Sequence, residues 1–215
     1  MPVRLRVPGF NPSGVVPGPA HLIADDTLSV AGALAGAYLL DGADTLPVWS
    51  LAGPGVWEYT GTSIKPTTGG TTLAMFDTAG SGGGDGLSGI IRARLAVKAT
   101  TNPFIGIVTR ATDVSNYIRW VVQSTTGKYR LTSHIAGVTN TLYDSTTDAT
   151  AGDVIGMEVA AGHVYLYVNG GLVQDVSAPS TLANAALQGT KWGVVGNFTT
   201  DPTSALDQVT FDLSA

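Results

Sequence analysis

The 215-residue chain contains no cysteine and only two glutamates, Glu58 and Glu158. Without cysteine it cannot form disulfides, a thiolate nucleophile or a cysteine-ligated zinc site. Charged residues amount to 13% of the chain. Because helix surfaces are usually rich in Lys and Glu, this scarcity disfavours a helical protein. The formal net charge of −5 also disfavours a nucleic-acid partner, since phosphate binding requires a basic surface.

The chain also lacks a long apolar run. A membrane-spanning helix needs about 20 consecutive apolar residues, and no segment reaches that length, so no membrane partner is expected. Arg4 and Arg6 near the start are followed by prolines instead of an apolar stretch, which is not the pattern of a signal peptide. We therefore expect synthesis in the cytoplasm without such a leader.

Residues that favour strands and tight turns, mainly Gly, Thr, Ser and Val, dominate the composition instead. Residues 90–99 alternate between apolar and basic side chains, as a strand with one buried face does. Residues 153–176 contain the clearest hairpins, with turns at Ala161-Gly162 and Asn169-Gly170. Apart from a single turn near 182–187, no segment keeps a 3.6-residue period. The sequence therefore predicts antiparallel β structure throughout.

Residues 1–24 form a separate zone in which prolines and glycines alternate, so this segment is not expected to join a sheet interior. It is either a disordered tail or an arm that docks on a neighbouring subunit. Val15, Val16 and Ile23 favour the arm, because an ordinary solvated linker is less apolar. Residues 25–215 are expected to form one β domain, interrupted by a flexible glycine-rich loop at 79–86.

Short motifs within residues 25–215 resemble those of concanavalin A-like (laminin-G-like) domains of the type found in phage proteins. These motifs are Asp41-Gly42-Ala43, Trp49, Gly55-Val56-Trp57, Val114 to Trp120, Gly127 to Leu131, Gly152-Asp153, Glu158-Val159, Val164 to Gly170 and Gly193 to Gly196. The resemblance implies an all-β, antiparallel two-sheet jelly-roll sandwich with an extended N-terminal arm. It does not specify a function, because this scaffold hosts lectins, glycosidases and structural modules.

The composition, rich in Ala, Gly, Thr and Val, also resembles that of virion proteins from phages of high-GC actinobacteria. The resemblance implies a minor tail protein located in the phage particle, whose sandwich serves adhesion or assembly and contacts host cell-envelope polysaccharide. The arm would bind other virion proteins, and a homo-oligomer is expected on symmetry grounds. One alternative is a capsid-surface decoration protein without a ligand. Another, from a different class, is a glycan-degrading enzyme.

No catalytic residues are expected. Glycosidases of this fold place paired carboxylates on one strand, and the chain has no such run; Asp41 and Asp44 come nearest and suit a turn. The histidines at 21, 134 and 163 are too dispersed for a metal motif. Calcium could draw on loop oxygens, but their spacing is not diagnostic, so no cofactor is expected. The candidate oxygens belong to Asp25, Asp26, Asp41, Asp44 and Asp113.

One outward sheet face is the candidate glycan-binding surface. If the turn at 124–127 closes a hairpin, Tyr117 lies opposite His134 and Val121 lies opposite Arg130, and the next hairpin sets Tyr143 opposite Arg130. The predicted ligand-binding residues are Tyr117, Arg119, Arg130, His134 and Tyr143, with Arg92, Arg94 and Arg110 as further candidates on the same sheet. Aromatic and hydrogen-bonding side chains suit a polysaccharide. The alternative is a solvated face with cross-strand pairs.

Two further groups of aromatic residues are assigned by the same alternation. Tyr165 and Tyr167, beside His163, form a similar ladder on another strand, with the same two alternatives. The four tryptophans are expected in the core, where their large apolar surface is best buried. They are Trp49, Trp57, Trp120 and Trp192.

Overall fold

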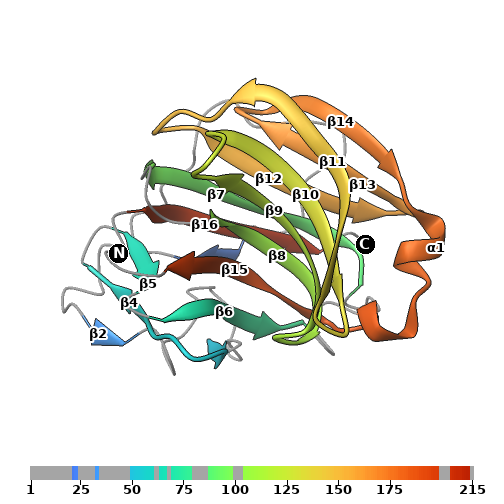
Figure 1. Ribbon diagram of the computed structural model, residues 1–215, viewed down its shortest axis with the longest axis horizontal. Coiled ribbons are helices and arrows are strands. Elements are labelled where there is room, and N and C mark those ends of the chain that lie inside the picture. Colours follow the sequence, from blue (N-terminus) through green and yellow to red (C-terminus); the bar gives the residue numbers. More distant parts are fainter. Residues whose placement is uncertain are drawn as a thin grey trace.

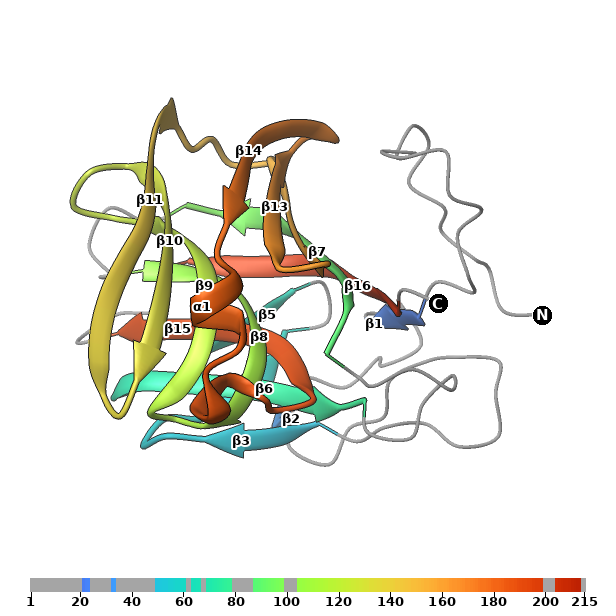
Figure 2. The same cartoon turned by 90° about the vertical axis from the view of Figure 1, so that its right-hand side faces the viewer.

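The computed structural model describes residues 21–23, 32–33, 49–60, 63–66, 69–78, 87–98, 104–198 and 204–213. Most of the predicted arm, the candidate oxygens of Asp25, Asp26, Asp41 and Asp44, and the loop 79–86 lie outside these ranges. The described residues form two antiparallel sheets that face each other as a sandwich, with little helix (Figures 1 and 2). This confirms the predicted all-β jelly-roll class.

The first sheet has nine strands in the order β14-β13-β12-β7-β16-β5-β4-β2, and β1 pairs with β16 beside this path. Its strands are β1 (His21–Ile23), β2 (Gly32–Ala33), β4 (Trp57–Tyr59), β5 (Ile64–Pro66), β7 (Gly89–Val97), β12 (Val154–Ala160), β13 (His163–Val168), β14 (Gly171–Ser177) and β16 (Ala205–Leu213). Because β1 pairs with β16, residues 21–23 at the end of the predicted arm lie in this sheet.

The second sheet has seven strands in the order β11-β10-β9-β8-β15-β6-β3. Its strands are β3 (Ser50–Ala52), β6 (Gly70–Asp77), β8 (Phe104–Asp113), β9 (Asn116–Gln123), β10 (Lys128–Ile135), β11 (Val138–Asp148) and β15 (Lys191–Phe198). Consecutive strands β8 to β11 form a meander, whereas β15 and β6 join the sheet from distant parts of the chain. The meander follows from local turns, and the remaining pairings depend on the tertiary fold.

The predicted hairpin turns are present, and their backbone explains their sequences. Ala161 and Gly162 have φ of 49° and 83°, and Asn169 and Gly170 have 51° and 81°. Positive φ at both central residues gives the turn twist that antiparallel strands require, and Asn and Gly adopt it at least cost. The turn before β10 closes as expected, with the amide of Gly127 donating to the carbonyl of Gln123 at 2.8 Å.

The connection from β14 to β15 carries the helical elements of the described residues. Helix α1 (Pro179–Leu182) and the 3₁₀ turn η1 (Ala185–Leu187) lie near the turn predicted at 182–187 and close one end of the sandwich (Figures 1 and 2). Leu182 and Leu187 are buried in the core. Neither element is long enough to span a membrane, nor is any other helix in the described ranges.

The core lies between the two sheets and contains all four tryptophans, as predicted. Trp57, Trp120 and Trp192 have no exposed surface and Trp49 is 2% exposed. Burying a large aromatic side chain contributes about 3 kcal/mol, so these four residues are a major part of what holds the layers together. Phe76 and Phe211 join them across the layers, with ring centroids 5.1 Å apart.

Candidate ligand-binding face

The register predicted between β9 and β10 is confirmed. Tyr117 lies opposite His134, and Val121 lies opposite Arg130. Arg119 falls between these pairs and lies opposite Thr132. Because Ile118, Trp120 and Leu131 point into the core, the alternating residues on the same strands point to the outer face of the seven-stranded sheet.

The predicted position of Tyr143 is wrong. The pairing of β10 with β11 shifts between Lys128 and Arg130 and again between Leu131 and Thr132. These irregularities place Tyr143 opposite Leu131, on the inner face, where its ring centroid lies 6.2 Å from that of Trp120. A one-residue shift exchanges the two faces of a strand, so Asp144 occupies the outer position opposite Arg130 instead.

The three further arginines do not extend this face. Arg92 and Arg94 are on β7, in the other sheet. Arg110 is on β8, but at a break in the pairing where its φ is 53°. Its buried guanidinium donates to the carbonyls of Leu87 and Leu182, at 3.1 and 2.8 Å. Arg110 therefore anchors neighbouring segments and is buried away from the surface.

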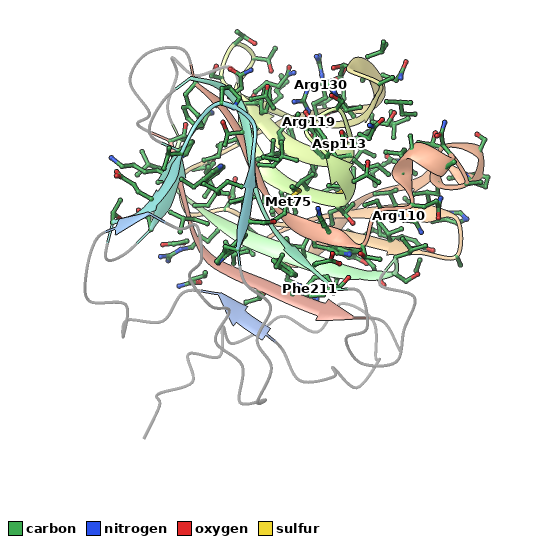
Figure 3. The ribbon with its side chains drawn as sticks, turned by 90° about the horizontal axis from the view of Figure 1, so that it is seen from below. Met75, Arg110, Asp113, Arg119, Arg130 and Phe211 are labelled. Carbon is green, nitrogen blue, oxygen red and sulfur yellow. The ribbon has the colours of Figure 1, made fainter. Side chains whose placement is uncertain are left out.

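The outer face of the seven-stranded sheet carries an apolar cluster of its own, here called the outer cluster. It runs across β6, β15, β8 and β9, and none of its members is more than 8% exposed. Its members are Leu73, Met75, Phe104, Val108, Ala111, Tyr117, Val121 and Val195. Met75, Arg119 and Arg130, which lie on three strands of this sheet, are labelled in Figure 3.

Arg119 lies at the edge of the outer cluster and is only 7% exposed. Its guanidinium carbon sits 3.9 Å from the centroid of the Phe104 ring and 5.9 Å from that of Tyr117. Its Nε donates to Oγ1 of Thr132 at 2.8 Å. Burial lowers the pKa of Arg119 below its ordinary value; the Tyr117 hydroxyl offsets part of this shift, and the nearby charge of Arg130 adds to it. The side chain is therefore held in place, but no carboxylate among the described residues balances its positive charge.

Tyr117 and His134 form a stacked pair beside Arg119, with ring centroids 4.8 Å apart and planes 4° from parallel. Tyr117 has no exposed surface, so it cannot offer its ring to a ligand in this arrangement. The Tyr117 hydroxyl and Nδ1 of His134 are buried and have no hydrogen-bond partner among the described residues. Burial, together with the Arg119 charge, lowers the pKa of His134.

Arg130 and Asp144 form the exposed part of this face. The Arg130 guanidinium donates to the Asp144 carboxylate, and their side chains are 32% and 54% exposed. Farther along the same edge, Nζ of Lys128 donates to the carbonyl of Thr146 at 2.6 Å and lies 3.2 Å from the Asp148 carboxylate. Arg119, Arg130 and His134 thus define a basic group on the outer face, here called the basic group.

Two glycines allow close approach of neighbouring strands behind this face. A Cβ at Gly106 would lie 2.2 Å from the carbonyl oxygen of Trp120, and one at Gly193 would lie 2.1 Å from that of Ala74. Real Cβ atoms do not approach a carbonyl oxygen this closely, so β8 and β15 require glycine at these positions.

The nine-stranded sheet carries the second aromatic group on its outer face. His163 and Tyr165 stack with centroids 5.7 Å apart, and Nδ1 of His163 lies 2.6 Å from the Asp175 carboxylate. The Tyr167 hydroxyl donates to Glu158 at 2.7 Å, and burial, strengthened by this bond, raises the pKa of Tyr167. On the same sheet, Nε of Arg94 donates to Asp207 at 2.7 Å.

No group of three or more His, Asp or Glu side chains suited to a metal occurs within the part of the chain that the structure describes. Asp113 is the one described member of the calcium candidates. Its carboxylate accepts hydrogen bonds from the amide of Ser115 at 2.6 Å and from Nδ2 of Asn116 at 3.0 Å. It therefore closes the turn between β8 and β9.

Three residues of this face were not among the predicted ligand-binding residues. Thr132 could have been found, because it follows Arg130 by two positions and so shares its face. The outer position of Asp144 depends on the irregular pairing of β10 with β11, which the sequence pattern does not reveal. Phe104 is the first residue of β8, and its position over Arg119 depends on how β8 pairs with β9.

No model of a known protein family matches the sequence, and no curated protein matches it either. Solved structures with a similar fold include the carbohydrate-binding module CBM66 from Bacillus subtilis, at 15% identity and a TM-score of 0.59, covering 76% of this chain and 94% of that chain. The CBM2 module of the evolved Dit of Lactobacillus casei BL23 phage J-1 is 9% identical, with a TM-score of 0.52 and coverages of 92% and 97%. A protein of unknown function from Shewanella oneidensis MR-1 is 13% identical, with a TM-score of 0.54 and coverages of 91% and 85%. At these identities the similarity is one of fold.

Proposed function

We propose that this chain is a non-catalytic carbohydrate-binding domain of a phage particle, a minor tail protein that contacts host cell-envelope polysaccharide. The ligand-binding surface is the basic group on the outer face of the seven-stranded sheet. The expected residue set is thereby revised to Arg119, Arg130 and His134, with Asp144 in place of Tyr143.

One observation carries the proposal: polar atoms on this face lack partners. The Tyr117 hydroxyl and Nδ1 of His134 are both buried without a hydrogen bond within the described ranges. An unpaired buried polar group costs about 1–3 kcal/mol. A ligand rich in hydroxyl groups would supply the missing partners, and a small rearrangement of the half-buried Arg130 and His134 side chains would admit it.

Two of the similar structures support the same function. The Bacillus subtilis structure is named a carbohydrate-binding module, and the phage J-1 structure is a module of that type within a phage Dit protein. Together with the phage-like motifs and composition, they favour a sugar-binding role on a virion. Attachment to other virion proteins through residues 1–24 and assembly as a homo-oligomer are parts of this proposal.

The arrangement of the two glutamates favours binding over hydrolysis. Glu58 is on β4 and Glu158 is on β12, and three strands lie between them in the sheet order. At about 4.8 Å per strand they are roughly 19 Å apart along the sheet, whereas glycosidase carboxylates lie within about 10 Å of each other. Each glutamate also has a partner already, Lys65 for Glu58 and Tyr167 for Glu158.

The test is binding of the whole chain to cell-envelope polysaccharide from actinobacteria, measured by affinity electrophoresis. Arg130→Ala and His134→Ala remove half-buried members of the basic group that do not belong to the outer cluster. Tyr165→Ala, on the other sheet, is the matched control. We expect saturable binding that both test variants weaken by about tenfold and the control leaves unchanged.

Binding that Tyr165→Ala abolishes and the test variants retain would move the site to the nine-stranded sheet. If the chain binds no envelope fraction, the carbohydrate-binding function is wrong. The sandwich would then be an assembly module without a ligand.

A further inference from the structure

We infer that the polysaccharide bound on this face is acidic and that Arg119 holds its negative group, a carboxylate or a phosphate. This inference rests on the proposed function and adds the chemical class of the ligand. It is drawn from the environment of one side chain, the Arg119 guanidinium.

The charge of Arg119 is buried without a counter-charge. The residue is 7% exposed, and its polar contacts among the described residues are with neutral groups: Nε donates to the hydroxyl of Thr132, and the Tyr117 hydroxyl lies close enough to interact with the guanidinium. No carboxylate pairs with it anywhere in the described part of the chain. A buried ion without a partner costs several kcal/mol, so a residue that only had to fill this position would be better apolar.

Neighbouring arginines differ from Arg119 in this respect. Arg130, on the neighbouring strand of the same face, forms a salt bridge with Asp144. Arg94, on the other sheet, forms one with Asp207. The chain therefore supplies carboxylates to arginines that are more exposed and leaves the most buried of the three without one. That distribution is the reverse of what fold stability alone would favour.

The geometry holds the guanidinium ready for a planar anion. The ring of Phe104 supports one face at 3.9 Å, and Thr132 fixes Nε. No carboxylate among the described residues engages the two Nη groups, and together they form the fork that binds carboxylate or phosphate oxygens in pairs. Because the side chain is immobilised already, binding would cost little conformational entropy.

The surroundings reinforce the positive charge. The Tyr117 hydroxyl and Nδ1 of His134, which have no hydrogen-bond partner within the described ranges, can each donate a hydrogen bond, and Arg130 lies on the adjacent strand. Burial and the neighbouring charge lower the pKa values of both Arg119 and His134. An anion placed among these groups would relieve that repulsion.

The test compares acidic and neutral forms of one polymer. The whole chain is titrated by calorimetry with polygalacturonate, with its fully methyl-esterified form, and with poly(glycerol phosphate). The esterified form keeps the sugar backbone and removes the charge. We expect at least one acidic polymer to bind about tenfold or more tighter than the ester, as a paired charged contact implies. The two acidic polymers distinguish a carboxylate ligand from a phosphate ligand.

Variants assign the effect to Arg119. Arg119→Met fills the same space without charge and should lose about tenfold or more in affinity for the acidic polymer, while Arg119→Lys, which keeps the charge but not the fork, should lose several-fold. Lys65→Met, on the nine-stranded sheet, changes the net charge equally and should stay within about twofold. Circular dichroism of each variant confirms folding.

The outcomes separate this inference from the proposed function. If the ester binds as tightly as the acidic polymers and Arg119→Met changes nothing, the domain binds neutral glycan and the acidic specificity is wrong. If no polymer and no envelope fraction binds, the function itself is wrong. In that case the NMR signal of the Arg119 Nε–H during titration with inorganic phosphate decides the anion site alone: a saturable shift supports it, and no shift overturns it.

Discussion

Arg94 and Arg119, on the outer faces of the two sheets, differ in whether a carboxylate compensates their charge. On the nine-stranded sheet, Arg94 is paired with Asp207 and His163 with Asp175, while Tyr167 donates to Glu158. On the seven-stranded sheet, Arg119 is more deeply buried and has only neutral partners among the described residues. The first face is balanced within the protein, as a structural surface should be. In the proposed function a ligand supplies the negative charge that Arg119 lacks among the described residues, and this difference separates the proposed site from the rest of the surface.

The largest expected effect is on stability, and it compares one glycine in each sheet, Gly106 in β8 and Gly156 in β12. Gly106→Ala in β8 would place a Cβ 2.2 Å from the carbonyl oxygen of Trp120, so we expect a loss of about 3 kcal/mol or more in the free energy of unfolding. Gly156→Ala in β12 is the control: its Cβ would lie 3.3 Å from that of Tyr167, and the change should stay within about 1 kcal/mol. Urea denaturation measures both. Equal stabilities would show that β8 can move away from β9.

The second comparison removes one arginine from each face. Arg94→Met leaves Asp207 without its partner, and because that carboxylate is only 10% exposed, we expect a loss of about 1–2 kcal/mol. The 41% exposure of Arg94 keeps the effect at this level. Arg119→Met removes a buried charge that has no counter-charge, so stability should be unchanged or raised. Thermal unfolding of both variants tests this, and a larger loss at Arg119 than at Arg94 would contradict the contrast between the faces.

The smallest effect concerns pH. Burial and the Arg119 charge lower the pKa of His134 below its ordinary value, so the folded protein favours the neutral ring. The stabilisation is complete above the unfolded pKa of about 6.5. It is lost as the pH falls through the lower folded pKa, because the unfolded chain then binds the extra proton.

We therefore expect His134→Gln to reduce the fall in melting temperature between about pH 7 and pH 5. Melting curves that are identical for wild type and His134→Gln across this range would mean that the ring titrates as it does in water.

Local sequence rules predicted much of the candidate face. The turn at 124–127 fixed the register of β9 and β10, so Tyr117, Arg119, Arg130 and His134 were placed on one face correctly. The same alternation failed for Tyr143, because the irregularities in the pairing of β10 with β11 depend on the neighbouring strands. It also failed for Val97, which follows the inward pattern of β7 yet is 45% exposed at the strand end.

By itself the sequence determined the antiparallel strands, the hairpin turns with positive φ and the burial of the tryptophans, because each depends on residues near one another in the chain. Only the tertiary structure decided which strands cover each other. It brought Phe104 over the guanidinium of Arg119, buried Tyr117 within the outer cluster, and placed no carboxylate of the described residues beside Arg119. Burial and electrostatic compensation depend on groups distant in sequence, so an alternating pattern can assign a residue to a face but cannot say whether its charge is balanced there.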